Sequence, residues 1–246
     1  MHEEYIRDVP GSDTAVLFIH GILGTPNHFR RFLPLVPKNW TVHNILLDGH
    51  GGTVEDFSKA SMQKWKERVQ REAELLAGRY ENILIAAHSM GALLAIEAAL
   101  AFPTQVKQLY LLAVPLKIFV KPSAVSNALK VIYNRVSPED AVALAAKEAY
   151  GIAPSKRLWS YVTCLPRYLE LFREVKAVRS TVGSLQVPCL AFQSEQDELV
   201  SLRSCNYLNG KPEITLSILK NSRHFYYGEA DFEFLLNEFK EMLHKK

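Results

Sequence analysis

The chain has 246 residues, a formal net charge of +3, 48% hydrophobic residues and 22% charged residues. This length suits one large α/β domain with a sizeable core, and the composition excludes wholesale disorder and collagen-like structure. The small net charge argues against nucleic acid as the main partner. We also find no apolar run of the roughly 18 residues that a membrane-spanning helix needs.

The three cysteines, Cys164, Cys189 and Cys205, have no close spacing. They predict neither a disulfide framework nor a zinc site, and each is expected to be a small buried side chain. The first four residues are acidic in character and lack the apolar core of a signal peptide. We therefore expect a cytoplasmic protein.

Six short apolar segments rich in β-forming residues predict strands. They span residues 14–19, 41–47, 82–87, 106–113, 187–193 and 214–219. Because nearly every position in them is apolar, we expect parallel strands that are buried on both faces. Helical spacing of apolar residues predicts helices over 61–77 and 232–243, and residues 90–101, which are small and apolar almost all round, predict a buried helix. This alternation predicts an α/β fold with a mostly parallel central sheet flanked by helices, which binds ligands beyond the carboxyl ends of its strands.

Residues 116–183 interrupt this alternation. They contain no convincing strand, and their pattern predicts helices over 124–133, 138–150 and 166–178. Such a connection between two strands is too long to be an ordinary loop. We therefore expect residues 1–115 and 184–246 to form the core, and residues 116–183 to form a small helical cap insertion whose last helix returns to it.

A serine lies where a predicted strand meets a predicted helix, in the segment Ala87-His-Ser89-Met-Gly91. This is the small-x-Ser-x-Gly pattern of a nucleophile elbow, a tight turn whose outer positions must be small. The turn exposes the serine hydroxyl at a helix N-terminus, where negative charge is stabilised. Ser89 is therefore the candidate nucleophile.

The segment His20-Gly-Ile22-Leu-Gly24 directly follows the first strong strand. An oxyanion hole needs two converging N–H donors: one from the residue after the nucleophile and one from an earlier strand-end turn. Met90 and Ile22 occupy these two positions, and the glycines allow the backbone to approach closely.

Asp197 and His224 each follow a predicted strand, at the sheet edge where Ser89 is expected. In this order along the chain, His224 Nε2 would accept the Ser89 proton, and Asp197 would hold the Nδ1 proton. Glu195 and Glu198 are rivals for the role of the acid. The remaining histidines near the motifs, at 20, 50 and 88, are interpreted as structural hydrogen-bonding groups.

On these motifs the chain resembles the α/β-hydrolase superfamily, and most closely its bacterial carboxylesterase and monoacylglycerol-lipase-like branch. The resemblance implies an α/β-hydrolase fold, a Ser89–Asp197–His224 triad and an oxyanion hole formed by the N–H groups of Ile22 and Met90. The segments that carry it are Phe18-Ile-His-Gly-Ile-Leu-Gly-Thr-Pro, Asp48-Gly-His-Gly-Gly52, Ala87-His-Ser-Met-Gly91, residues 188–200 and Ser222-Arg-His224.

The chain departs from the family pattern at four places. Ala87 and Asp48 stand where glycine and proline are usual, and Arg223 stands where a glycine often precedes the histidine. Fewer than 15 residues precede the first strong strand, so the usual antiparallel hairpin at the start of the sheet is expected to be reduced or absent.

These observations predict a serine hydrolase that cleaves small or medium-chain carboxylic esters through an acyl-enzyme. Thioesters, C–C bonds, peptides and perhydrolysis remain alternative chemistries, as does a non-catalytic binding protein on this fold. We expect a small-molecule ester as the partner, no cofactor, no metal, no nucleotide and no membrane contact, and the oligomeric state stays open. Part of the apolar insertion is expected to line an acyl pocket, and its basic residues are expected to form a solvated face, Arg167 included.

Overall fold

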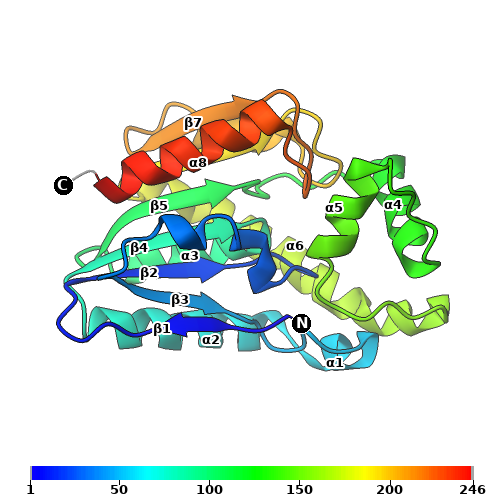
Figure 1. Cartoon of the computed structure of the whole chain (residues 1–246), viewed down its shortest axis with the longest axis horizontal. Helices are drawn as coiled ribbons and strands as arrows, with labels where there is room; N and C mark the ends of the chain where they lie inside the picture. Colours follow the sequence, from blue (N-terminus) through cyan, green and yellow to red (C-terminus); the bar gives the residue numbers. More distant parts are fainter. Residues whose placement is uncertain (1, 245–246) are drawn as a thin grey trace.

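Within residues 2–244, the part of the chain that the computed structural model describes, a seven-stranded sheet has the order β1-β3-β2-β4-β5-β6-β7 (Figure 1). Its six parallel strands are β2 (Thr14–Ile19), β3 (Thr41–Ile45), β4 (Asn82–His88), β5 (Val106–Leu112), β6 (Cys189–Ser194) and β7 (Ile214–Leu219). These are the six predicted strands. The mostly parallel α/β sheet predicted from the alternation of elements is confirmed.

Strand β1 (Tyr5–Arg7) was not predicted, because three residues are too short to show a strand pattern. It pairs antiparallel with β3 and forms one edge of the sheet. The Arg7 guanidinium fixes this strand by donating to the carbonyl oxygen of Pro37 at 2.7 Å. The antiparallel hairpin is therefore reduced to a single short strand.

The prediction that the strands are buried on both faces is confirmed for the central strands and is wrong for β7. All residues of β2 and β3 are buried. In β7 only the two terminal residues are buried, and Ile218 is 44% exposed. The reason is position, because β7 pairs with β6 alone and forms the second edge of the sheet.

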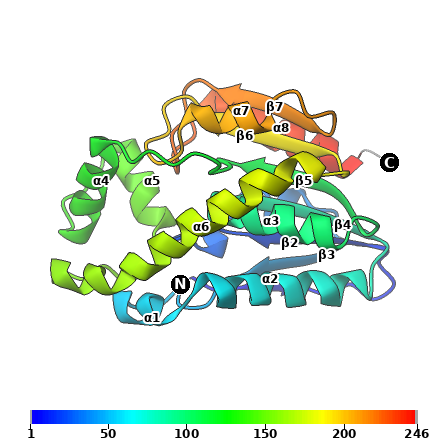
Figure 2. The same ribbon diagram turned by 180° about the vertical axis from the view of Figure 1, so that it is seen from behind.

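Helices cover both faces of the sheet. One face packs against α2 (Met62–Ala77), α3 (Met90–Ala101) and α6 (Leu165–Thr181), and the other against α8 (Glu229–His244) and the short helices η1 (Pro26–Phe29) and η2 (Leu33–Leu35) (Figures 1 and 2). In α2 the buried residues recur at helical spacing as Trp65, Val69, Ala73 and Leu76, as expected from the sequence. No helix among residues 2–244 is both long and apolar enough to cross a bilayer.

The segment between β5 and β6 is helical. It contains α4 (Pro122–Ile132), α5 (Ala141–Ala149), η3 (Leu158–Cys164) and α6, and α4 and α5 lie beyond the carboxyl ends of the strands (Figure 1). The second half of α6 packs against the sheet-covering helices, with Val175 and Val178 buried in the same core as α3. Arg167 is not solvated as predicted, because its guanidinium donates to Ser58 O at 2.8 Å near the end of α1 (Val54–Lys59).

Short elements complete the described chain. These are η4 (Val182–Ser184), η5 (Leu202–Ser204) and α7 (Cys205–Leu208). All three cysteines are free thiols, and Cys164 and Cys189 are buried as expected. Cys205 is half-buried, since it begins the short surface helix α7.

Candidate active site

Ser89 lies on a strained turn between β4 and α3. Its φ of 52° and ψ of −124° lie outside the regions that non-glycine residues prefer, a conformation that costs on the order of 1–3 kcal/mol. The Ser89 side chain does not cap α3, so its hydroxyl is not occupied by a hydrogen bond to the first turn of the helix. A Cβ at Gly91 would overlap Ile19 O and lie 2.6 Å from His20 O, which explains why the elbow pattern requires a glycine there.

Asp197 and His224 meet in the loops after β6 and β7. His224 Nδ1 lies 2.9 Å from Asp197 Oδ2, and both residues are 2% exposed. The other carboxylate oxygen of Asp197 accepts the N–H groups of Leu199 at 2.7 Å and Val200 at 2.8 Å. The carboxylate can only accept, so Nδ1 carries the proton and Nε2 is left as a base.

The two rival acids lie elsewhere. Glu195 is exposed. Glu198 is 4% exposed, but its Oε2 accepts the main-chain N–H of His224 at 3.3 Å and does not bond the imidazole. Among the three acidic residues of this loop, the structure therefore brings Asp197 to the His224 ring.

The electrostatics of His224 favour its protonated form more than those of an ordinary histidine. Burial by itself disfavours the imidazolium, but the charge and hydrogen bond of Asp197 and the charge of Glu198 outweigh it. The pKa of His224 is therefore raised above its ordinary value of 6.5. A base with such a pKa is well matched to proton transfer near neutral pH.

The turn after β2 packs directly against the elbow. A Cβ at Gly21 would lie 2.8 Å from Ser89 Cβ, so the backbone at Gly21 packs against the serine with no room for a side chain. Ile22 lines the same cavity as Ser89. Met90 follows Ser89 as the first residue of α3, where a backbone N–H has no acceptor within the helix. These are the two positions predicted for the oxyanion hole.

His20 and His50 hold this turn through backbone hydrogen bonds. His20 Nε2 accepts Leu47 N–H at 3.0 Å, and His50 Nε2 accepts Leu23 N–H at 3.1 Å. Burial lowers the pKa of His50 to about 4 and that of His20 well below its ordinary value, so both rings stay neutral. Their placement fits the structural role expected from the sequence.

A cavity of 260 Å³ joins Ser89, His224 and the helical insertion. Its walls are mostly apolar and come from α4, α6 and the loops after β2, β5, β6 and β7, with Tyr150 at the end of α5 and Tyr168 on α6 contributing aromatic rings. Part of the apolar side chains between β5 and β6 line it, whereas the exposed side chains of Phe119 and Trp159 do not. The lining residues from the insertion and its start are Pro115, Ile118, Val120, Ala124, Val125, Ala128, Tyr150, Tyr168, Leu171 and Phe172.

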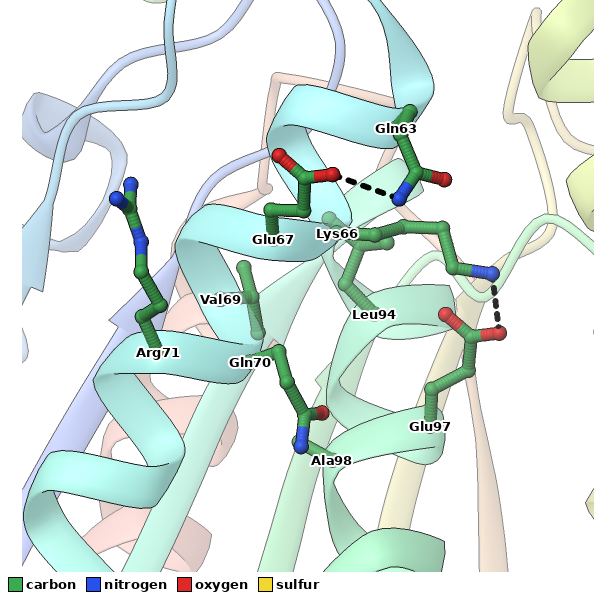
Figure 3. A pocket seen from close by; sticks show the side chains of 9 residues that line it. All are labelled: Gln63, Lys66, Glu67, Val69, Gln70, Arg71, Leu94, Glu97 and Ala98. Carbon is green, nitrogen blue, oxygen red and sulfur yellow. Dashed lines mark hydrogen bonds and ion pairs between the residues drawn. The ribbon is translucent and has the colours of Figure 1, made fainter.

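A larger groove, of 450 Å³, lies between α2 and α3 on the outer helical face (Figure 3). Four of its polar side chains pair with one another, since Lys66 bonds Glu97 at 2.7 Å and Gln63 bonds Glu67 at 2.8 Å. It contains neither a nucleophile nor a histidine. Volume alone would therefore favour this groove over the cavity that contains Ser89 and His224. The chemistry of the lining residues favours the smaller cavity as the candidate active site.

Among residues 2–244, no group of three His, Cys, Asp or Glu side chains is arranged to hold an ion.

His28, which sequence reasoning did not single out, stacks on His88 with ring centroids 4.0 Å apart. Burial, followed by the proximity of His224, lowers the pKa of His28 to about 3.

Comparison with solved structures identifies the fold. A lipolytic enzyme of the metagenome-derived pair LipS and LipT matches with a TM-score of 0.75 and 22% identity, over 100% of this chain and 98% of that one. The monoacylglycerol lipase of Paleococcus ferrophilus matches with a TM-score of 0.69 and 16% identity, over 98% and 99%. The thioesterase domain from the curacin biosynthetic pathway matches with a TM-score of 0.60 and 18% identity, over 99% of both chains.

At these identities the neighbours establish the fold and not the substrate. A search of curated proteins finds no match. The sequence profile of the alpha/beta hydrolase family matches residues 16–233, which include every candidate residue described above. This match confirms the resemblance inferred from the motifs, and the chain belongs to the alpha/beta hydrolase family.

Proposed function

We propose that this hydrolase cleaves carboxylic esters with an acyl group of medium length through a serine acyl-enzyme. One observation carries the proposal: Ser89 and His224 line the same apolar cavity, while His224 is held at 2.9 Å by a buried carboxylate of Asp197. A nucleophile, a base with a fixed tautomer and an apolar binding space are the components that acyl transfer from an ester requires.

The proposed reaction has two halves. Ser89 Oγ attacks the ester carbonyl carbon while His224 Nε2 accepts its proton, and the N–H groups of Ile22 and Met90 stabilise the oxyanion. The imidazolium then protonates the departing alkoxide, which leaves as the alcohol. Water, deprotonated by the same nitrogen, attacks the acyl-enzyme and releases the acid, and the proton returns to Ser89. The residues carry the reaction without a cofactor.

The cavity supports an acyl group of limited length. Its volume is 260 Å³, and at about 30 Å³ for a water-sized group it holds roughly nine such groups. The carbonyl oxygen takes one place, which leaves roughly eight carbons. We therefore propose substrates near the octanoyl ester in length.

The test combines probe labelling with an ester panel. Wild-type protein is expected to react with a fluorophosphonate probe and to hydrolyse p-nitrophenyl esters, and Ser89→Ala is expected to lose both while keeping its melting temperature. Acyl-thioesters of matched chain length, measured beside the esters, separate ester from thioester preference. Retained hydrolysis in Ser89→Ala would overturn the proposal, and faster turnover of thioesters would change its substrate class.

A further inference from the structure

Two side chains outside the proposed triad contact His224 through its main chain. His88 Nε2 lies 3.0 Å from the carbonyl oxygen of His224, which is 136 positions away in the sequence. On the other side of the same residue, Glu198 Oε2 accepts the His224 N–H at 3.3 Å. With the Asp197 bond to the ring, the structure thus holds both the main chain and the imidazole of His224.

His88 is suited to hold a neighbour and not to exchange protons with a substrate. A carbonyl oxygen only accepts, so we assign the proton of the His88 ring to Nε2. Burial, together with the nearby rings of His28 and His224, lowers the pKa of His88 well below its ordinary value, so the ring stays neutral. The residue is 1% exposed and does not line the cavity. Stacking on His28 at 4.0 Å fixes the ring in place.

Glu198 connects His224 to the helical insertion. Its side chain accepts the His224 N–H, and its own carbonyl oxygen accepts the N–H of Lys121, at the start of α4, at 2.8 Å. The residue is 4% exposed and does not line the cavity either. A buried carboxylate next to Asp197 places a second negative charge near the imidazole, and such a charge favours the imidazolium.

We propose that His88 and Glu198 are positioning residues that hold His224 at the spacing from Ser89 that proton transfer requires. His88 directly precedes Ser89, so the junction of β4 and α3 carries both the proposed nucleophile and a group that holds the base. A displacement of about 1 Å in such a site can cost on the order of 10²-fold in rate. This inference rests on the proposed function, because the spacing matters only if Ser89 and His224 exchange a proton.

The His88 contact is tested by separating its hydrogen bond from its ring. His88→Phe keeps a stacked ring and loses the donor, and we expect kcat and the rate of fluorophosphonate labelling to fall about 10–100-fold with KM within about twofold. His88→Gln offers an amide N–H at a similar position and is expected to recover most of the loss. His28→Phe keeps an aromatic ring stacked on His88 and loses the 3.4 Å contact between His28 Nε2 and the Tyr227 hydroxyl, so it controls for disturbing the surroundings of His88 and is expected to keep nearly full activity.

Equal losses in His88→Phe and His88→Gln, at unchanged melting temperature, would assign His88 a packing role and overturn its part of the proposal. Wild-type rates in both His88→Phe and His88→Gln would also overturn this part of the proposal. If His88→Phe fails to fold, His88→Leu, which also lacks the donor, takes its place in the comparison with His88→Gln, and equal losses in these two variants again overturn this part of the proposal.

The Glu198 contact is tested through the pH profile. The titratable groups that face His224 are Asp197 and Glu198 from the loop after β6, His88 from the end of β4 and His28 from η1. Glu198→Gln keeps an oxygen acceptor and removes the charge. Because activity requires neutral His224, the acid limb of kcat/KM should move to lower pH while kcat at high pH changes little.

Glu198→Ala removes the acceptor as well, and kcat should fall about tenfold or more at every pH. Glu195→Gln, in the same loop but exposed, should change neither quantity. An unmoved acid limb in Glu198→Gln, together with an unchanged kcat in Glu198→Ala, would overturn the role of Glu198. A wild-type protein that is not labelled at Ser89 refutes the proposed function instead, whereas normal labelling of wild type and all variants refutes this inference alone.

Discussion

Shortening the apolar cavity should shift the acyl-chain preference by a predictable number of carbons. Ala128 lies on α4 and lines the cavity that Ser89 and His224 share. Ala128→Leu adds three carbon atoms, which occupy about 90 Å³ at about 30 Å³ each. Because the cavity measures 260 Å³, the longest acyl group that fits should shorten from about eight carbons to about five.

The energetic consequence follows from the burial of methylene groups. Each buried CH₂ contributes about 0.8 kcal/mol, which corresponds to roughly fourfold in kcat/KM. In wild type, kcat/KM should rise by up to this factor per carbon until roughly eight carbons and then level off or fall. Three excluded methylenes in Ala128→Leu should lower kcat/KM for the octanoyl ester by about 60-fold and leave the butanoyl ester nearly unchanged.

The assay is a series of p-nitrophenyl esters from acetyl to dodecanoyl, measured for wild type and variant at subsaturating concentration. Ala177→Leu is the matched control, since Ala177 is exposed on α6 and does not line the cavity. An octanoyl-to-butanoyl ratio that stays within about twofold of wild type in Ala128→Leu would show that the acyl chain does not occupy this cavity.

Three further predictions concern the acid, the elbow and the buried His43 on β3. Asp197→Asn should lower kcat by about 10²–10⁴ through loss of the fixed tautomer, and a larger effect of Glu195→Gln would show that the acid is misassigned. Gly91→Ala should reduce stability by about 1–3 kcal/mol or more, because its Cβ would overlap backbone oxygens; thermal melting checks this, with Gly78→Ala, which has no neighbour closer than 3.5 Å, as the tolerated control. His43 is buried against Glu72 and Asp8, and although burial opposes its charge, these partners raise its pKa. The stabilisation that protonated His43 contributes to the folded state should therefore be present in full below about pH 6.5 and be lost as the pH rises through the raised pKa of His43 in the folded protein. A melting temperature whose pH dependence is the same in wild type and in His43→Gln would refute this.

Local sequence patterns were sufficient for the framework of this fold. Apolar runs located the six parallel strands, because a strand buried on both faces needs apolar residues at almost every position. Helical spacing located α2, an almost wholly apolar stretch located α3, and the long strandless stretch located the helical segment between β5 and β6. Patterns failed for β1 and for the exposed face of β7, where pairing at a sheet edge, and not local composition, decides the structure.

The positions of the candidate residues followed from chain order. Ser89 lies on the elbow because only small neighbours fit its turn, and this requirement is visible in the sequence. Asp197 and His224 lie at loop positions after consecutive strands, whose ends share one edge of the sheet. The sequence favoured Asp197 but left Glu195 and Glu198 as rivals, because side-chain direction in a loop depends on tertiary packing, and only the structure brings Asp197 to the His224 ring.

Tertiary structure alone placed the groups that surround His224. His88 contacts it across 136 positions, and Glu198 reaches its N–H instead of its ring. The cavity likewise combines residues from two helices of the insertion with the ends of several strands. A sequence pattern reports which backbone conformation each segment prefers and which of its residues are buried. Contacts between distant loops depend instead on how the completed sheet brings those loops together.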